Sequence, residues 1–463
     1  MKSEFIYKEN NSRLIVIFAG WAMDSTPFHT LRRDGYDVMV VWDYRDFSLD
    51  WSYTADYAEI CIVAWSLGVY AAAVASVPIA ARTTLRIAVN GTLTPVDNQR
   101  GIPVAIFEGT LDGLNGRNLS KFYRRIAGSR DVFGCFAASI PKRDIEELKE
   151  ELAAFLPKDF FSQQPDTRFD RAIISRDDAI FPAVNQWRAW EGTPTSIVEG
   201  AHLPDFQAIL DRFIRDKDFT CRRFAAGSPS YDGNATVQLG LVEKMRTVME
   251  NFDIPALMCR RGSRTIEIGS GTGSLSEILD SYAGRFGTIE MWDIAGEAPL
   301  EGPRRIFRRT DAELQLLRTP SASADFIVSA STVQWFNSPS RFLHESARVL
   351  THGGLLLIGT YSTGNLASVE AVTGRGLPLL SPEQWQQLAP DNLELLHSMD
   401  YTEEMEFDSA ADIFRHLKAT GVNSLSRNTG AGTLRRAIKA MQPGLDGKFR
   451  IEYRPILFLY RRK

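Results

Sequence analysis

Two short segments carry residue types whose spacing suits catalysis. Residues 63–68 read V-A-W-S-L-G, with Ser66 between an apolar run and a run of small residues. This order is typical of a strand, a tight turn and a helix that together expose a serine as a nucleophile toward an ester carbonyl. Residues 267–273 read E-I-G-S-G-T-G, so three glycines follow a second apolar run and allow the backbone to approach a ligand. The chain therefore carries two candidate reaction centres of different chemistry.

A serine needs a base before it can attack, and residues 1–217 contain two histidines. His202 lies in E-G-A-H-L-P, directly after an expected final strand, which is where an α/β-hydrolase places its histidine. His29 lies in an expected early helix and is interpreted as a surface or capping residue. The sequence therefore predicts His202 as the general base for Ser66.

The acid of such a triad lies on a loop after a strand, between the serine and the histidine in chain order. Asp177 and Asp178 both meet this condition. Asp178 is followed by A-I-F-P, the commoner arrangement for a triad acid, so we predict Asp178 and interpret Asp177 as its solvated neighbour. Asp112 follows another apolar stretch and is the third candidate for the triad acid.

The oxyanion that forms when a serine attacks an ester needs two backbone N–H donors. One comes from the residue after the serine and the other from the loop after an early strand. Leu67 and Trp21 occupy these positions, and Gly20 lets the second loop approach closely. We therefore predict Leu67 and Trp21 as the oxyanion donors, with the Trp21 indole as the floor of an acyl pocket.

The second centre has the spacing E-x-G-x-G-x-G, which is typical of S-adenosylmethionine-dependent enzymes, whereas a dinucleotide site has G-x-G-x-x-G. Asp293 ends the next strand, where a carboxylate can accept hydrogen bonds from ribose hydroxyls. Asp311, as the third strand ends, is placed to hold the adenine amine. The predicted donor-binding residues are Glu267, Gly269, Gly271, Gly273, Asp293, Asp311 and Ala312.

Neither zinc ligands nor an obvious general base accompany this glycine-rich loop. A carboxylate acceptor needs neither, because it is already a nucleophile at neutral pH and has only to be positioned. The pattern therefore favours methylation of a carboxyl group by S-adenosylmethionine, without a metal.

The 463 residues are enough for two domains, both of the α/β class. Residues 1–217 alternate short apolar strands with helices, which indicates a parallel sheet covered on both faces and favours an α/β-hydrolase fold. Residues from about 113 to 166 interrupt this rhythm with charged, helical sequence and are interpreted as a cap. The expected strands are residues 14–18, 38–42, 60–64, 87–89, 172–174 and 196–198.

A second rhythm follows a helical stretch at 205–216 and a polar bridge at 217–226, so the second domain is expected to span 218–463. Its pattern favours a Rossmann-like class I methyltransferase fold. Strands are expected at 265–268, 288–292, 326–329 and 355–359, with segments 399–407 and 449–460 as an antiparallel edge.

Composition excludes several other classes of protein. A formal net charge of −4 gives no reason to expect nucleic acid as a partner, because such binding needs a basic face, while local basic patches stay open. No apolar run approaches the roughly 20 residues that span a bilayer. Residues 1–10 are charged and polar and lack a signal core, so a cytoplasmic location is expected. The four cysteines form no C-x-x-C pair, which argues against a disulfide framework or a zinc site.

The second half resembles the BioC family of malonyl-[acyl-carrier protein] O-methyltransferases over nearly all of residues 220–463. The motifs that carry the resemblance are R-F-A-A at 223–226, Tyr231, the loop at 267–273, V-Q-W at 333–335 and H-L-K-A-T-G-V at 416–422. The resemblance implies S-adenosylmethionine as donor and a malonyl-loaded acyl carrier protein as acceptor. Tyr231, Gln334 and Trp335 are candidates for binding the acceptor carboxylate.

The first half, over roughly residues 1–215, resembles the BioG type of pimeloyl-[acyl-carrier protein] methyl ester esterase. The matching motifs are F-A-G-W at 18–21, A-W-S-L-G at 64–68 and I-F-E-G-T at 106–110. Together the two resemblances imply a bifunctional carboxylic ester hydrolase and carboxyl O-methyltransferase of biotin-precursor synthesis. One activity would methylate a malonyl thioester, and the other would hydrolyse the methyl ester of the elongated pimeloyl product.

Basic residues in the expected cap suggest how a carrier protein is held. Arg124 and Arg125, with Arg117, Lys121 and Arg130, are hypothesised to dock the acidic carrier protein, although a solvated helix face explains any single one equally well. Two alternative functions remain. One is a general carboxylesterase joined to a small-molecule methyltransferase, and in the other one half is a binding module.

Overall fold

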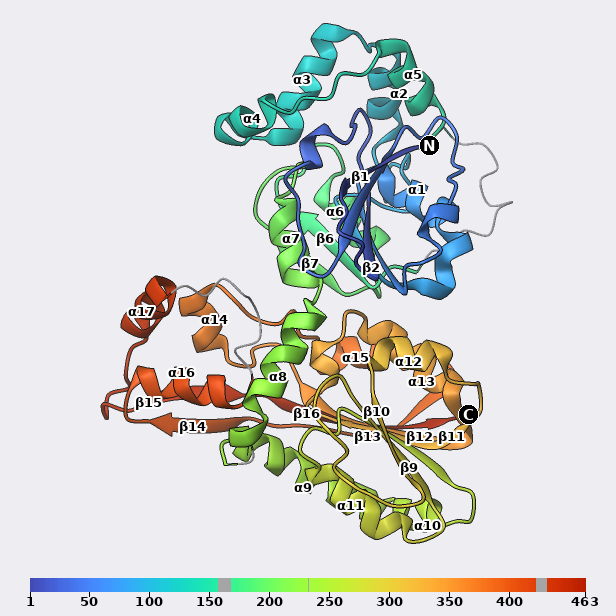
Figure 1. Cartoon of the computed structure of the whole chain (residues 1–463). Helices are drawn as coiled ribbons and strands as arrows, with labels where there is room; N and C mark the ends of the chain where they lie inside the picture. Colours follow the sequence, from blue (N-terminus) through green and yellow to red (C-terminus); the bar gives the residue numbers. More distant parts are fainter. Residues whose placement is uncertain (157–167, 232, 422–430) are drawn as a thin grey trace. The chain divides into compact units, whose positions relative to one another are not determined.

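The chain forms two compact units, Met1–Ile214 and Arg215–Lys463, each built on its own seven-stranded sheet (Figure 1). The computed structural model describes residues 1–156, 168–231, 233–421 and 431–463. The change of unit between Ile214 and Arg215 lies close to the domain boundary that the sequence predicts near residue 218. Within the described residues, no helix is long and apolar enough to cross a bilayer.

The sheet of the first unit has the order β1-β3-β2-β4-β5-β6-β7. All neighbouring pairs are parallel except β1 and β3. Strands β2, β3, β4 and β5 are almost entirely buried, because helices cover both faces of a parallel sheet. The strands are β1 (Lys2–Tyr7), β2 (Arg13–Phe18), β3 (Asp37–Trp42), β4 (Glu59–Trp65), β5 (Thr83–Val89), β6 (Arg171–Ser175) and β7 (Thr195–Val198), and the helices beside them are α1 (Gly68–Ala75), α6 (Ala183–Ala189) and α7 (Phe206–Phe213).

The six strands predicted for this unit are confirmed, whereas β1 was not expected. Its sequence K-S-E-F-I-Y is half exposed at the edge of the sheet and lacks the apolar run that marks the buried strands. The early helix expected around His29 is also wrong. A single 3-10 turn, Thr26–Phe28, precedes that residue.

Four helices between β5 and β6 form a cap at one end of the first unit (Figure 1). Side chains of Asn115, Ser129 and Asp144 accept hydrogen bonds from backbone N–H groups and so begin three of these helices. The cap starts at Val104, earlier than the expected residue 113, and residues 157–167 of the expected range lie outside the described residues. The cap helices are α2 (Val104–Asp112), α3 (Gly116–Ala127), α4 (Arg130–Ala137) and α5 (Ile145–Ala153).

The sheet of the second unit has the order β10-β9-β8-β11-β12-β16-β13. Strand β16 is antiparallel to both of its neighbours, and the remaining pairs are parallel. The chain leaves β8 toward one edge and returns to β11 on the other side, so the strand order reverses between β8 and β11. The strands are β8 (Arg264–Ile268), β9 (Thr288–Asp293), β10 (Arg305–Arg309), β11 (Ala324–Ala330), β12 (Leu350–Tyr361), β13 (Leu393–Asp400), β14 (Glu403–Phe407), β15 (Phe449–Tyr453) and β16 (Pro455–Arg462).

The antiparallel edge differs from the expected single pair of segments. Each segment divides, so that β13 and β16 join the main sheet while β14 and β15 form a separate two-stranded sheet. Pro455, which has no N–H to donate, marks the division between β15 and β16. Strand β10, R-I-F-R-R, is the third strand that the sequence predicts before Asp311 without giving its bounds, and it is a charged, largely exposed edge strand.

Helices cover both faces of this sheet (Figure 1). Helices α9, α10 and α11 pack with buried residues of one face, and α12, α13 and α15 pack with those of the other. The polar bridge expected at 217–226 is instead helical, because Asp216 accepts a hydrogen bond from the Phe219 N–H and starts α8. The helices are α8 (Lys217–Tyr231), α9 (Thr236–Asn251), α10 (Ile254–Met258), α11 (Ser274–Ala283), α12 (Ala312–Arg318), α13 (Pro339–Val349), α14 (Ala367–Thr373), α15 (Pro382–Leu388), α16 (Ala410–Ala419) and α17 (Ala431–Ala440).

Gly68 lets α1 start against the end of β2. A Cβ at this position would lie 2.5 Å from the Ala19 carbonyl oxygen and 2.6 Å from that of Phe18. We predict that Gly68→Ala destabilises the first unit by about 1–3 kcal/mol, because backbone atoms cannot move aside as a side chain can.

Hydrogen–deuterium exchange of the β2 and β4 peptides in the full chain measures this loss, as exchange faster by about tenfold. Gly109→Ala is the matched control, because nothing lies within 4 Å of its added Cβ in α2. This control should leave exchange in β2 and β4 unchanged. Equal exchange in the two variants would contradict the prediction.

Candidate active sites

Ser66 lies where the strand order of the first sheet reverses. From β2 the chain passes to β3 on one side and then to β4 on the other, so the loops after β2 and β4 open side by side at the carboxyl ends of the strands. This is where open α/β sheets bind ligands. Ser66 itself has φ of +60°, the left-handed backbone of a tight strand-to-helix turn.

The structure brings together the three residues predicted as a triad. His202 Nε2 lies 2.9 Å from Ser66 Oγ, and His202 Nδ1 lies 2.9 and 3.0 Å from the two carboxylate oxygens of Asp178. All three are buried, with Ser66 5% exposed and His202 1% exposed. With Nδ1–H donated to Asp178, Nε2 is free to accept the serine proton, which is the geometry of nucleophilic catalysis.

The carboxylate of Asp178 is fixed by further donors. Its Oδ1 accepts the backbone N–H groups of Ile180 and Phe181, at 2.8 and 2.9 Å. Its Oδ2 accepts the amide of Gln186 on α6, at 2.9 Å. Asp177 is exposed beside it, which is the placement expected for a solvated neighbour, and Asp112 is an exposed residue at the end of α2.

The loop that carries His202 is held by residues that sequence reasoning missed. Trp65 Nε1 and Asn90 Nδ2 both donate to the His202 carbonyl, each at 2.9 Å, and the Phe181 ring stacks on the imidazole. Asn90 follows β5 and also bonds Ser175 at the end of β6. A polar residue directly after a buried strand was the available signal for Asn90.

The two predicted oxyanion donors lie on the adjacent loops after β2 and β4. Among the described residues, neither the Trp21 N–H nor the Leu67 N–H has a hydrogen-bond partner. The Trp21 side chain packs edge-on against Phe122 of α3 and donates from Nε1 to the Leu148 carbonyl of α5, at 2.9 Å. Its indole is therefore part of the contact between this loop and the cap.

A cavity in the second unit lies at the reversal point between β8 and β11. The loop after β8 forms one wall, and the residues after β9 and β11 form others. The predicted residues that line it are Glu267, Gly269, Gly271, Asp293, Asp311, Ala312 and Trp335, together with Ser270, Thr272, Ile294, Ser331 and Thr332. Gly273 does not line it, because this residue, with φ of +100°, is the N-cap of α11.

The donor set of this cavity fits S-adenosylmethionine. Asp293 accepts the N–H groups of Gly271 and Ala295, each at 2.8 Å, which leaves carboxylate lone pairs for ribose hydroxyls. A Cβ on Gly271 would meet nothing within 4 Å, so the loop faces open space. Glu267 Oε1 and Ser270 Oγ are buried without a hydrogen-bond partner among the described residues.

Asp311 is tied to a lysine that sequence reasoning missed. Lys217 Nζ lies 2.7 Å from Asp311 Oδ2 and 2.6 Å from Glu313 Oε2, and all three side chains are nearly buried. Asp311 Oδ1 also accepts the Glu313 N–H and caps α12, the helix that Ala312 begins. Lys217 lies on α8, 94 positions away in sequence, so no local pattern joined it to this site.

Burial raises the pKa of Glu267 to about 8, although a hydrogen bond from Ser276 partly opposes this. Burial also raises the pKa of Asp293, against the hydrogen bonds that its carboxylate accepts from the backbone. At neutral pH the Glu267 carboxyl is therefore largely protonated, so the floor of the cavity carries less negative charge than its sequence suggests.

The three residues predicted to bind the acceptor carboxylate are not grouped in one place. Trp335 lines the cavity and packs edge-on against Phe224. Gln334 does not line it, because its amide is engaged by the Ser331 carbonyl at 2.6 Å and the Thr360 hydroxyl at 3.0 Å. Tyr231 ends α8, and its side chain lies outside the described residues.

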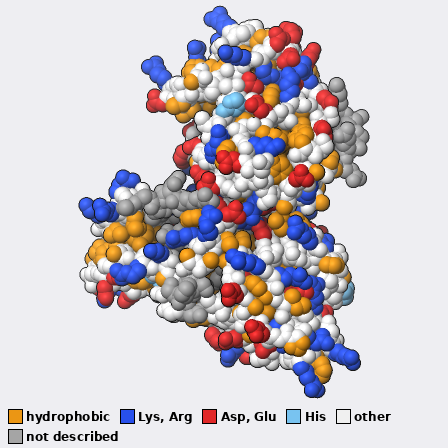
Figure 2. Space-filling model, in the orientation of Figure 1, with side chains coloured by type: hydrophobic (Ala, Val, Ile, Leu, Met, Phe, Trp, Pro, Cys, Tyr) orange, Lys and Arg blue, Asp and Glu red, His pale blue; other side chains and the backbone are white. Residues whose placement is uncertain are grey.

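The predicted docking arginines are exposed on α3, where Lys and Arg side chains gather at the cap end of the unit (Figure 2). The Arg124 guanidinium lies over the Phe133 ring of α4, 5.5 Å from its centre. Arg125 instead donates from Nη2 to the Ala179 carbonyl, at 2.7 Å, and so contacts the loop of the triad acid. The two arginines are therefore not equivalent.

Sequence relationships extend over both units. A malonyl-[acyl-carrier protein] O-methyltransferase from Bacteroides fragilis is 31% identical over 465 aligned positions, which cover 97% of this chain and 93% of the relative. The chain belongs to that family. Residues 1–208 match the family of the pimeloyl-ACP methyl esterase BioG, and residues 266–358 match a methyltransferase domain family. The two resemblances predicted from the sequence are thus confirmed, as are the α/β-hydrolase and methyltransferase folds.

Relatives of each half are also known separately. The crystal structure of BioG from Haemophilus influenzae is 35% identical and covers 44% of this chain and 94% of its own, with a TM-score of 0.39. A malonyl-[acyl-carrier protein] O-methyltransferase from the same organism is 28% identical over 259 residues, or 53% of this chain and 95% of the relative.

The raised pKa of Glu267 predicts how stability depends on pH. Between about pH 4.5 and pH 8 the unfolded chain releases this proton while the folded chain retains it, so the second unit loses stability as pH rises. Glu267→Gln removes this loss of stability. The second unit of the variant should therefore become increasingly more stable than that of the parent protein from pH 5 to pH 8.

Hydrogen–deuterium exchange of the β8 and α11 peptides between pH 5 and pH 8, corrected for intrinsic exchange, measures this difference in stability. The ratio of exchange rates between the parent protein and the variant should grow by up to about tenfold per pH unit. Glu301→Gln is the control, since Glu301 is exposed in the same unit. An advantage independent of pH would contradict a raised pKa at Glu267.

Proposed function

We propose that the chain is a bifunctional enzyme of biotin-precursor synthesis, which installs a methyl ester at the start of acyl elongation and removes it at the end. The observation that carries this proposal is a serine triad with adjacent oxyanion loops in the half related to BioG, on one chain with a methyltransferase half. The substrates are acyl carrier protein thioesters, malonyl for the methyltransferase and pimeloyl methyl ester for the esterase.

In the esterase reaction, Ser66 Oγ attacks the ester carbonyl while His202 Nε2 takes its proton. Asp178 holds the imidazole in the required tautomer and stabilises its charged form. The oxyanion then accepts the N–H groups of Trp21 and Leu67. His202 returns the proton to the departing methanol, and water releases the pimeloyl group from Ser66 by the same sequence of steps.

In the methyltransferase reaction, bound S-adenosylmethionine supplies a methyl group on a positively charged sulfur. The free carboxylate of the malonyl group is already a nucleophile at neutral pH, so the chain has only to orient it. Asp293 holds the ribose and Asp311, kept in place by Lys217, holds the adenine. Trp335 contributes to the wall that the acceptor faces.

The pairing of these reactions has a physical reason. A terminal carboxylate is costly to bury in the apolar acyl site of an elongating enzyme, and a methyl ester removes its charge. Hydrolysis restores the charge once elongation is complete. Pimeloyl exceeds malonyl by four methylenes, and their burial is worth about 3 kcal/mol, which is roughly a hundredfold preference.

Two substitutions separate the activities. Ser66→Ala should abolish hydrolysis of pimeloyl methyl ester on the carrier protein and leave methylation of malonyl carrier protein intact. Gly271→Arg should do the reverse, because it fills the open space before the glycine-rich loop. Intact-mass spectrometry of the carrier protein measures both reactions as loss or gain of one methylene mass.

Hydrolysis by Ser66→Ala at the parent rate would contradict the triad assignment. Hydrolysis of free short esters without preference for the carrier-linked ester would favour the general carboxylesterase alternative. Either result would leave the methyltransferase assignment in place.

We also propose that the exposed cationic face of α3 docks the acidic carrier protein. Lys121→Glu with Arg124→Glu should raise KM for the carrier-linked ester about tenfold or more, because charge complementarity mainly governs encounter. The kcat for a free methyl ester should stay unchanged. Steady-state rates on both substrates at low and high salt measure this effect.

Arg188→Glu on α6 is the control for charge alone, since Arg188 is also exposed. Arg125→Glu should instead slow both substrates, because it removes the contact with the Ala179 carbonyl. An unchanged KM in the Lys121 and Arg124 double variant would exclude docking on α3.

A further inference from the structure

The loop that carries Trp21 is fastened to the cap at several successive groups. We call residues 19–24 the oxyanion loop. Trp21 Nε1 donates to the Leu148 carbonyl of α5 at 2.9 Å, and the Tyr123 hydroxyl of α3 donates to the Ala22 carbonyl at 3.0 Å. Arg143, which precedes α5, donates from Nη1 to the Met23 carbonyl at 3.2 Å. The cap therefore bonds the loop directly as well as covering it.

The oxyanion loop has a conformation that needs such support. Ala22 has φ of +65°, in the left-handed region that residues other than glycine rarely adopt. Such residues persist where surrounding contacts define the backbone more strongly than its own preference does. Hydrogen bonds to the carbonyls of Ala22 and Met23 provide those contacts.

One connection leads from Arg143 to the oxyanion donor. The Met23 N–H donates to the Gly20 carbonyl at 3.3 Å. That carbonyl belongs to the same planar peptide group as the Trp21 N–H, so fixing the Gly20 oxygen fixes the direction of the Trp21 donor. Arg143 bonds the carbonyl of Met23, the residue that anchors this peptide group.

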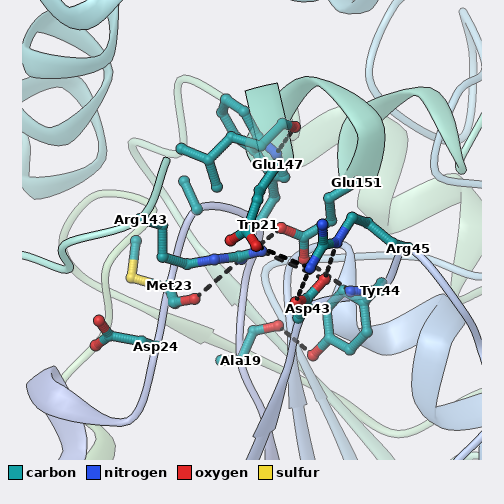
Figure 3. Close-up of polar contacts among 12 residues, drawn as sticks. Ala19, Trp21, Met23, Asp24, Asp43, Tyr44, Arg45, Arg143, Glu147 and Glu151 are labelled. Carbon is teal, nitrogen blue, oxygen red and sulfur yellow. Dashed lines mark hydrogen bonds and ion pairs between the residues drawn. The ribbon is translucent and has the colours of Figure 1, made fainter. Parts of the chain in front are cut away.

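Arg143 lies in a buried charge cluster with Asp43, Arg45 and Glu151 (Figure 3), in which its Nη1 forms hydrogen bonds while its Nε and Nη2 have no hydrogen-bond partner among the described residues. Its side chain is 5% exposed, with Nη1 2.5 Å from Glu151 Oε2 and Nη2 3.4 Å from Asp43 Oδ1. Burial acts to raise the pKa of Asp43, but hydrogen bonds from Arg45 and Lys2 outweigh it and hold that pKa below its usual range. Asp43 therefore faces Arg143 as a carboxylate, whereas burial raises the pKa of Glu151 despite its hydrogen bond from Arg143.

The same cluster holds the beginning of the oxyanion loop. Glu151 Oε1 accepts the Tyr44 N–H at 3.0 Å, and the Tyr44 hydroxyl donates to the Ala19 carbonyl at 2.6 Å (Figure 3). Buried ion pairs add little net stability, because desolvation offsets their attraction. A contribution to folding stability therefore does not by itself explain why a buried arginine bonds a carbonyl of this loop.

We propose that Arg143 is a positioning residue for ester hydrolysis, which holds the Gly20–Trp21 peptide group so that the Trp21 N–H meets the oxyanion. This inference rests on the proposed esterase function of the first unit. Glu151 and Asp43 orient the guanidinium, and Tyr123 supports the adjacent carbonyl. The cap is thus part of the machinery that stabilises the oxyanion.

The test compares Arg143→Met with Arg45→Met in the full chain. Both variants remove a cation that pairs with Asp43. Within the described residues, no hydrogen bond or ion pair joins Arg45 to the oxyanion loop, and in Arg45→Met the cations of Lys2 and Arg143 still face the Asp43 carboxylate. Loss of one oxyanion donor costs roughly 100- to 1,000-fold in kcat, so partial misplacement in Arg143→Met should cost about 10- to 100-fold with KM for a short methyl ester nearly unchanged. Arg45→Met should stay within about threefold.

Binding of butylboronic acid distinguishes positioning from general loosening, because its adduct with Ser66 places an oxygen where the oxyanion forms. Arg143→Met should weaken this inhibitor by about the same factor as it lowers kcat/KM. Tyr123→Phe provides a second route that keeps the shape of the side chain, and it should lower kcat by several-fold. Hydrogen–deuterium exchange of the β2 and β4 peptides in each variant checks that the first unit is folded.

Equal loss in Arg143→Met and Arg45→Met, a loss confined to KM, or unchanged boronate affinity would overturn the inference. If Arg143→Met does not fold, the Tyr123→Phe result decides, and unchanged kcat and boronate affinity there would overturn it. Hydrolysis that persists in Ser66→Ala would overturn the proposed function as well. A Ser66-dependent enzyme that is indifferent to Arg143 would refute the positioning role alone.

Discussion

The left-handed backbone of Ser66 is the constraint on which the first active site depends. A residue with a side chain loses about 1–2 kcal/mol in this conformation, so its surroundings must enforce it. The Ser66 N–H donates to the Val89 carbonyl, and the Ser66 carbonyl accepts the Val69 N–H. A Cβ on Gly91 would lie 2.2 Å from the backbone oxygen of Ser66, so the segment that follows β5 leaves only enough room for glycine. These contacts direct the serine hydroxyl toward His202.

Both candidate sites use the same property of α/β sheets. Each lies beyond the carboxyl ends of two parallel strands where the strand order reverses, which opens a space without breaking the sheet. The first unit fills this space with the buried, hydrogen-bonded side chains of Ser66, His202 and Asp178. The second leaves it open and lines it with backbone N–H groups, carboxyl groups and a loop of glycines. The two sites therefore differ in the residues of the loops that follow the strands, and not in the sheet that carries those loops.

Local sequence predicted the parts of each site that follow a strand directly. Ser66, Asp178 and His202, which the structure places within hydrogen-bond distance of one another, could be predicted together because each follows an apolar run in the order that this fold requires. Strand β1 was missed because an exposed, charged edge strand lacks that signal.

The supporting residues were missed for a different reason. Lys217 and Arg143 act on groups about a hundred positions away, and no periodic pattern in a sequence records such a contact. Gln334 is the opposite case. A family motif predicted that it binds the acceptor carboxylate, whereas its amide is hydrogen-bonded to Ser331 and Thr360. Motifs thus located the reacting groups, while packing decides what holds them. Because the cap bonds Trp21, Ala22 and Met23 directly, it cannot be exchanged as a module that only sets substrate size. A cap transplanted from another hydrolase, or one rebuilt to accept shorter chains, would have to reproduce those three bonds or lose catalytic power together with its old specificity.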